Sequence, residues 1–71
     1  MRTDTEAVEF WGKKKVCPVT SMSSSGLDRA VASGGFPKPV RLSRNRVAWV
    51  AAEVRAWMEQ RIAQRDRAEV A

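Results

Sequence analysis

Residues 33–50, SGGFPKPVRLSRNRVAWV, determine how the rest of the chain is interpreted. Two glycines and two prolines come first, and apolar and basic residues then alternate as far as Trp49. Glycine commonly ends a helix and proline stiffens a turn, whereas a period of two is typical of a β-strand. The stretch therefore predicts the end of a helix, a rigid corner and a short β-hairpin.

The hairpin is predicted to turn at residues 43–46. Alternate side chains of its two strands then share one face, which is expected to cover the core. In pairs, they are Leu42 with Val47 and Val40 with Trp49. Arg41 and Ala48 point to the other side. The turn tip holds Arg44 and Arg46 in solvent around Asn45, a residue suited to turns; the two arginines either contact a polyanion or simply keep the loop soluble.

After the hairpin, apolar residues recur at helical spacing and predict a helix from about Ala52 to Gln64. The stripe consists of Val50, Val54, Trp57, Met58 and Ile62. Acidic and basic residues balance on the other sides, so this helix is predicted to pack on the core rather than on a membrane. Residues 65–71 show no second stripe and are predicted to form a flexible tail.

Two shorter helices are predicted before residue 33. The first covers Lys15 to Thr20, with Val16, Cys17 and Val19 partly inward. Its proline, Pro18, is expected near the first turn, where amides lack partners inside the helix. Cys17 is expected to be a small buried apolar residue, because no base lies beside it to activate the thiol.

The second helix is predicted to begin after the N-cap Ser23, to run to Ser33 and to stop at Gly34. Its apolar side consists of Leu27, Ala30 and Val31. Its opposite side is small, polar and charged, and carries Ser24, Ser25, Asp28 and Arg29. This second side is the candidate recognition surface.

Charge divides the chain into three blocks. Residues 1–12 carry three acids against Arg2, a net charge of −2. Residues 13–46 carry eight cations against Asp28, a net charge of +7, and residues 47–71 are neutral. A polyanion is therefore expected to bind the middle block. Lys13, Lys14 and Lys15 at its start are candidate weaker contacts to a phosphate backbone.

Composition excludes several function classes. The chain has no histidine and a single cysteine, so neither an internal disulfide nor a Cys/His zinc site is expected. Because no nucleophile–base pair and no carboxylate cluster is visible, we expect no catalytic residues, no metal and no cofactor, and hence no enzyme. No apolar run approaches the roughly 18 residues of a membrane span. A cytoplasmic protein associated with the bacterial nucleoid, with no membrane partner, is expected.

The order of these elements predicts an α+β fold, a small winged helix-turn-helix with three helices and a β-hairpin wing. In such a fold the second helix enters the major groove of double-stranded DNA and the wing contacts the backbone. The domain is expected to span residues 13–64, between an acidic N-terminal segment, 1–12, and the tail. In that segment Thr3 and Glu6 have capping-box spacing, whereas Val8 to Trp11 fit a strand that joins the wing; we favour the strand.

Residues 16–58 resemble the small AlpA-like and phage-excisionase-like proteins of the MerR-type winged-helix group. The resemblance is most specific at FPKPVRL (36–42) and EVRAW (53–57), and looser at TSMS (20–23), where the family pattern is T-G-L-S. It implies that Ser25 and Arg29 are recognition contacts, that Lys38 and Arg41 contact the backbone, and that two tryptophans, Trp49 and Trp57, lie in the core.

Two residues depart from the family pattern. Gly26 stands where the pattern has threonine, and Asp28 where it often has tyrosine. An aspartate there is expected either to accept a hydrogen bond from a cytosine amino group or to orient Arg29.

The resemblance implies two roles with one binding mechanism. The first is an excisionase, or recombination directionality factor, which binds tandem sites beside an attachment site, bends the DNA and assists a tyrosine integrase. The second is a transcriptional regulator at a promoter. A third interpretation, from a different class, is an adaptor that holds a protein partner with its last helix. The acids of residues 1–12 also fit the basic block of a neighbouring copy, which predicts head-to-tail self-association on DNA.

Overall fold

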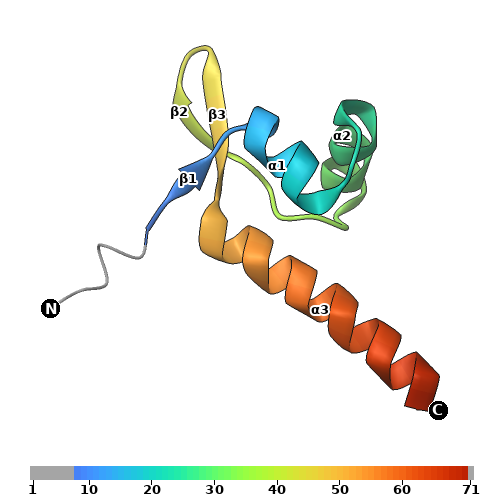
Figure 1. Cartoon of the computed structure of the whole chain (residues 1–71). Coiled ribbons are helices and arrows are strands. Elements are labelled where there is room, and N and C mark those ends of the chain that lie inside the picture. Colours follow the sequence, from blue (N-terminus) through green and yellow to red (C-terminus); the bar gives the residue numbers. More distant parts are fainter. Residues whose placement is uncertain (1–7, 71) are drawn as a thin grey trace, which may run out of the picture.

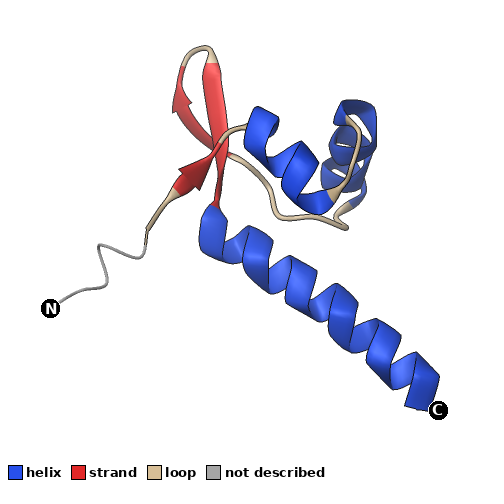
Figure 2. Cartoon of the chain, viewed as in Figure 1, coloured by secondary structure: helices blue, strands red, loops and turns tan. Residues whose placement is uncertain are grey.

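The computed structural model describes residues 8–70 and contains three helices and a three-stranded antiparallel sheet (Figures 1 and 2). Along the chain the elements are β1 (Phe10–Trp11), α1 (Lys13–Thr20), α2 (Ser24–Ser33), β2 (Val40–Ser43), β3 (Arg46–Val50) and α3 (Ala51–Val70). This α+β order is that of a winged helix-turn-helix and confirms the predicted fold. The predicted capping-box pair, Thr3 and Glu6, lies outside the described residues.

The sheet joins the segment before α1 to the hairpin. Its strand order is β1-β3-β2, and β1 pairs with β3 through Phe10 opposite Val50 and Trp11 opposite Trp49. Opposite residues of an antiparallel pair point to the same face, so the two tryptophans enter the core together, 7% and 3% exposed. The predicted third strand is therefore confirmed at residues 10–11.

Helix α1 starts two residues earlier than predicted, because Gly12 is its N-cap. Pro18 is consequently the sixth helical residue, and the prediction that it lies near the first turn is wrong. Proline has no amide to bond to the carbonyl four residues earlier, which here belongs to Lys14. Both residues are exposed, so water can satisfy that carbonyl and the helix tolerates the proline.

Two serines in the turn between α1 and α2 determine where the first helix ends and the second begins. Ser21 adopts a left-handed conformation, with φ of 61°, at the end of α1. Ser23 caps α2 because its side-chain oxygen accepts a hydrogen bond of 3.0 Å from the Gly26 amide. At the other end Gly34 ends α2 with φ of 85°, a conformation that glycine adopts without strain. The predicted start and end of this helix are confirmed.

The hairpin has a different register from the predicted one. Ser43 pairs with Arg46 across the turn, but Arg41 pairs with Val47 and Val40 with Ala48. An irregularity between Arg41 and Ser43 leaves the intervening residue without a partner, as a β-bulge does. The expected Leu42–Val47 and Val40–Trp49 pairs are therefore wrong, and of the four expected core residues only Trp49 is buried; Val40, Leu42 and Val47 are exposed.

The core forms where α1, α2 and α3 meet the sheet. It consists of Trp11, Val16, Leu27, Phe36, Trp49, Ala51 and Val54. Phe36 packs edge-on against Trp49 and Trp57, with ring centroids 6.4 and 4.8 Å away. The two indole N–H groups donate to the carbonyls of Pro37 at 2.8 Å and Gly35 at 2.6 Å. The FPKP corner is thus held by one apolar ring and two hydrogen bonds.

Some expected core residues lie outside it. Cys17 and Trp57 are half-buried against the core, while Val19 is 39% and Ile62 is 50% exposed. Both of the latter were expected to face inward, Val19 only in part. Val19 lies on the outer side of a very short helix, and Ile62 lies beyond the last core contact of α3.

Helix α3 is longer than predicted and extends away from the domain (Figure 1). It continues to Val70, whereas the sequence suggested an end near Gln64 and a flexible tail. Residues 65–70 contain neither glycine nor proline, so intrinsic propensity suffices to continue the helix without an apolar stripe. From Glu59 to Ala68 every side chain is exposed. No helix in residues 8–70 is both long enough and apolar enough to cross a membrane.

Candidate nucleic-acid interface

The outer face of α2 presents the residues that the sequence singled out. Leu27 is fully buried and fixes the inner side of the helix against the core. The opposite side is exposed along its length and brings together Ser24, Ser25, Asp28 and Arg29. Within residues 8–70, the guanidinium of Arg29 takes part in no ion pair. One helical face therefore offers two hydroxyls, a carboxylate and a cation to a ligand.

The carboxylate of Asp28 is paired with the beginning of α1. Lys13 Nζ lies 2.8 Å from Asp28 Oδ1, and the two side chains are 39% and 64% exposed. Of the two sequence-based expectations for Asp28, orientation of Arg29 is not what the structure shows, because the observed partner is Lys13. The pair was missed by sequence reasoning. One signal pointed to it, since Asp28 is the only acid between residues 13 and 52.

The three consecutive lysines of α1 have different surroundings. Lys13 is held by Asp28, and Lys15 Nζ lies 5.0 Å above the ring of Trp11. Lys14 is exposed. Cations over an indole ring are stabilised by the ring quadrupole. Lys14 is thus the lysine of this group that the described contacts leave to solvent.

The β2–β3 hairpin carries its cations at the tip. Arg44 and Asn45 form the turn, and Arg46 closes it opposite Ser43. Arg41 Nη1 donates to the Arg44 carbonyl at 3.2 Å, so this guanidinium supports the turn as well as facing solvent. The candidate wing residues are all exposed. In the view of Figure 1 the hairpin and α2 stand on the two sides of α1, and α3 extends away below them.

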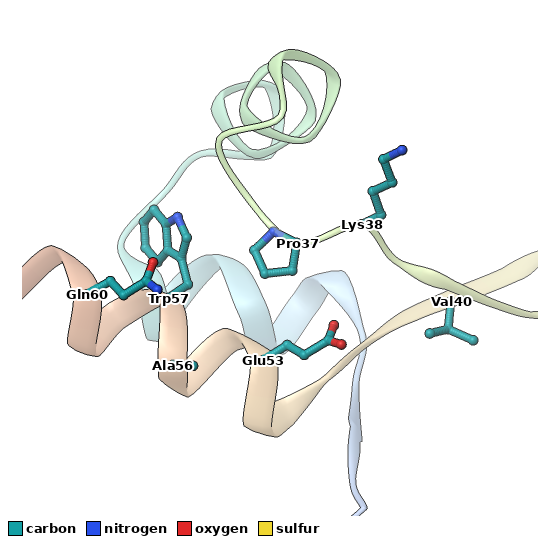
Figure 3. A pocket seen from close by; sticks show the side chains of 7 residues that line it. All are labelled: Pro37, Lys38, Val40, Glu53, Ala56, Trp57 and Gln60. Carbon is teal, nitrogen blue, oxygen red and sulfur yellow. The ribbon is translucent and has the colours of Figure 1, made fainter.

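A groove separates the corner after α2 from α3 (Figure 3). Its lining residues are Pro37, Lys38, Val40, Glu53, Ala56, Trp57 and Gln60. Lys38 is the one cation of this lining, and Glu53 offsets its charge. The groove as a whole therefore lacks the concentration of positive charge that a phosphate backbone requires, and the candidate interface remains on α2, the start of α1, and the segment from Lys38 through the wing.

The acidic N-terminal segment contributes one described carboxylate with clear partners. Glu9 accepts a hydrogen bond of 3.0 Å from Trp11 Nε1 and lies 3.5 Å from Arg55 Nη2. The hydrogen bond from Trp11 is the main cause that holds the pKa of Glu9 below its ordinary value of 4.5. Desolvation opposes it, and the charge of Arg55 lowers the pKa further by a smaller amount. Arg55 also lies 4.9 Å above the Trp11 ring. Glu9 is therefore engaged within its own chain, and its expected contact with a neighbouring copy stays a prediction.

Comparison with known proteins places this chain in a family. The family model described as "Prophage CP4-57 regulatory protein (AlpA)" matches residues 12–62. A protein of Enterobacteria phage P4, described as "Uncharacterized protein ORF88", is 40% identical over 64 residues, which cover 90% of this chain and 73% of that protein. No solved structure matches the chain significantly. The matched region runs from the N-cap of α1 into the exposed part of α3, and so contains all the candidate contact residues.

Proposed function

The chain belongs to the AlpA family of prophage regulatory proteins, a DNA-binding and not an enzymatic family, and we propose that it recognises specific sites on duplex DNA. In this proposal α2 lies in the major groove, whose width of about 12 Å admits one helix. The hairpin lies against the neighbouring backbone. The observation that carries the proposal is the exposed polar face of α2, held in place by its buried opposite face.

The contacts divide into two classes. On α2, Arg29 is the candidate for a bidentate contact to a guanine edge, and Ser24 and Ser25 are hydrogen-bonding groups of short reach. The other cations are expected to contact phosphates. Contacts of this kind position the protein on the duplex but carry no sequence information. These cations are Lys14, Lys38, Arg41, Arg44 and Arg46, with Asn45 at the wing tip and Lys13 and Lys15 as weaker contacts.

Arg29→Ala tests the orientation of α2. If Arg29 reads a guanine, the variant loses about 1–3 kcal/mol of discrimination between the selected site and a site mutated at that base. Its affinity for unrelated DNA changes little. Band shifts on selected, mutated and unrelated duplexes measure this, with Arg67→Ala on the distant part of α3 as a control of equal charge. Equal losses on all three duplexes would place Arg29 on phosphate.

Regulation of transcription at a promoter is the role that the family description favours. In this role the protein contacts a short stretch of DNA within a promoter, and its binding either blocks transcription or activates it. Protection mapping on the promoters near its own gene tests this role. Protection restricted to the attachment region would count against it.

A directionality function in excision is the second candidate, and the small size of the DNA-contacting surface supports it. One helix and one hairpin bury little area, so useful affinity has to come from neighbouring copies on tandem sites. In this role head-to-tail copies bend the DNA and a tyrosine integrase is the partner. Titration on one, two and three tandem sites distinguishes it, because cooperativity and bending then increase with the number of sites.

A further inference from the structure

The Lys13–Asp28 pair lies on the face that the proposed function places against DNA. Asp28 is the single acid in a block of net charge +7, and its side chain is 64% exposed. An exposed pair of this kind contributes little to folding stability. Its position on the polar face of α2, beside Arg29, gives it a different significance, because every charge on that face acts directly on bound DNA.

A carboxylate in the major groove has a restricted choice of partners. Cytosine presents an amino donor there with no acceptor of its own, and adenine presents an amino donor beside its N7 acceptor, which repels the carboxylate. Guanine presents only acceptors, and thymine an acceptor and a methyl group. A carboxylate facing acceptors keeps whatever cation it already has. Lys13 is that cation in the unbound protein, at 2.8 Å. Its long flexible stem allows its ammonium group to move to a phosphate when the carboxylate finds another donor.

We propose that Asp28 determines specificity by controlling Lys13, an inference that rests on the proposed function. On a site with cytosine opposite Asp28, the amino group of the base bonds to the carboxylate and Lys13 is released to a phosphate. On other sequences Asp28 retains Lys13, and that phosphate contact is absent. One contact to the DNA backbone thereby depends on one base. Lys13 is the ion-pair partner of Asp28 in the unbound protein and contacts a phosphate on the selected site.

Coupling of this kind has a signature in the salt dependence of binding. Each phosphate contact changes the slope of log K against log salt by about 0.9. The wild-type slope is therefore expected to be steeper by about 0.9 on the selected site than on the same site with cytosine replaced. Asp28→Asn frees Lys13 on every sequence, so the difference between the two slopes disappears and binding to unrelated DNA strengthens several-fold.

Selection from randomised duplexes identifies the bound site and tests the proposal in the same experiment. Wild type is expected to select cytosine at one position, and Asp28→Asn is expected to lose about tenfold or more of that preference. The matched control is Asp66→Asn, which removes the carboxylate of another exposed pair, 2.7 Å from Arg65 on distant α3, with the same change of net charge. Lys13→Gln is the second variant, and it should abolish the slope difference while the cytosine preference falls only in part.

The outcomes separate this inference from the proposed function. If wild type selects a site and Asp28→Asn selects it equally well, with slopes that change as in Asp66→Asn, then Asp28 acts only through net charge and the inference is overturned alone. If wild type selects no duplex, the proposed function fails and the inference fails with it. Melting followed by circular dichroism verifies that each variant is folded before it is compared.

Discussion

Ser21 occupies a backbone conformation that suits glycine better than serine. Its φ of 61° lies in the left-handed region, where an L-residue is strained by about 1 kcal/mol. Glycine removes that strain but gains more freedom in the unfolded chain, which partly offsets the benefit. Ser21→Gly is therefore expected to raise the free energy of unfolding by about 0.5 kcal/mol, or a few degrees in melting temperature.

Thermal melting of Ser21→Gly beside Ala32→Gly checks this expectation. Ala32 lies within α2, where glycine costs about 1 kcal/mol relative to alanine, so the control should melt earlier while Ser21→Gly melts later. A lower melting temperature for both variants would mean that Ser21 is not strained. The same position is glycine in the T-G-L-S pattern, and the observed φ gives a physical reason for that glycine.

Glu9 makes the stability of the chain depend on pH. Its pKa is lowered in the folded state by the Trp11 hydrogen bond and the Arg55 charge. A depressed pKa means that the folded state favours the ionised carboxylate, so the stabilisation is complete above the ordinary value of 4.5 and is lost as pH falls through the folded pKa. Glu9→Gln should therefore melt below wild type at neutral pH and coincide with it in acid.

Urea unfolding of wild type and Glu9→Gln from neutral pH down to about pH 3 measures this difference. Asp66→Asn is a suitable control, because its carboxylate contacts only the exposed Arg65 among the described ion pairs. A gap between wild type and Glu9→Gln that stays constant down to the lowest pH would show that the ionisation of Glu9 does not contribute, and that the amide disturbs the site by its shape.

At the scale of elements, the wing is expected to bind DNA without reading its sequence. Arg44 and Arg46 extend from the hairpin tip into solvent, and arginines of such a loop meet phosphates or the minor groove. Replacing both with alanine should weaken binding to selected and unrelated duplexes by the same factor. Band shifts with both duplexes decide the point, and a loss confined to the selected site would show that the wing reads bases.

The outer part of α3 is expected to be dispensable for folding. No side chain from Glu59 to Ala68 is buried, so ending the chain after Gln64 should shift the melting temperature by less than about 2 °C. The helical signal in circular dichroism should decrease, because the truncated chain lacks the last part of α3. Val54→Ala on the fully buried part of the same helix is the contrast, with an expected loss of about 2 kcal/mol. A large effect of truncation that depends on protein concentration would reveal self-association through α3.

The elements differ in how well local sequence specifies them. Ser23 starts α2 through its side-chain cap, and Gly34 ends it through its left-handed backbone conformation. Both preferences follow from residue type, so the limits of that helix could be predicted. The hairpin register depends on a bulge between Arg41 and Ser43, and because no residue type uniquely marks a bulge, alternation alone predicted the wrong pairs. The Lys13–Asp28 contact depends on how α1 is placed against α2, which is a property of packing that sequence spacing does not contain.

At the scale of the whole molecule, charge and fold are arranged to separate two surfaces. The basic block of residues 13–46 covers α1, α2 and the wing, whereas α3 carries balanced charge. Charge distribution is visible in the sequence, and for that reason the candidate surface could be predicted from the order of residues alone. Its finer function could not, since promoter binding and excision use the same contacts and differ in the DNA and the partners.

Binding to duplex DNA should weaken steeply with salt, because most of the block's cations are exposed and each phosphate contact releases counterions. Lys13 is held by Asp28 and Lys15 lies over Trp11, so about five or six of the eight are expected to engage phosphate at once. The slope of log K against log salt should then be about −5. Titrations from about 50 to about 300 mM salt measure it, and replacing both Arg44 and Arg46 with alanine should make it shallower by about 2. A slope of about −1 in wild type would place most of these cations away from the DNA and would contradict the docking of α2 and the wing on one duplex.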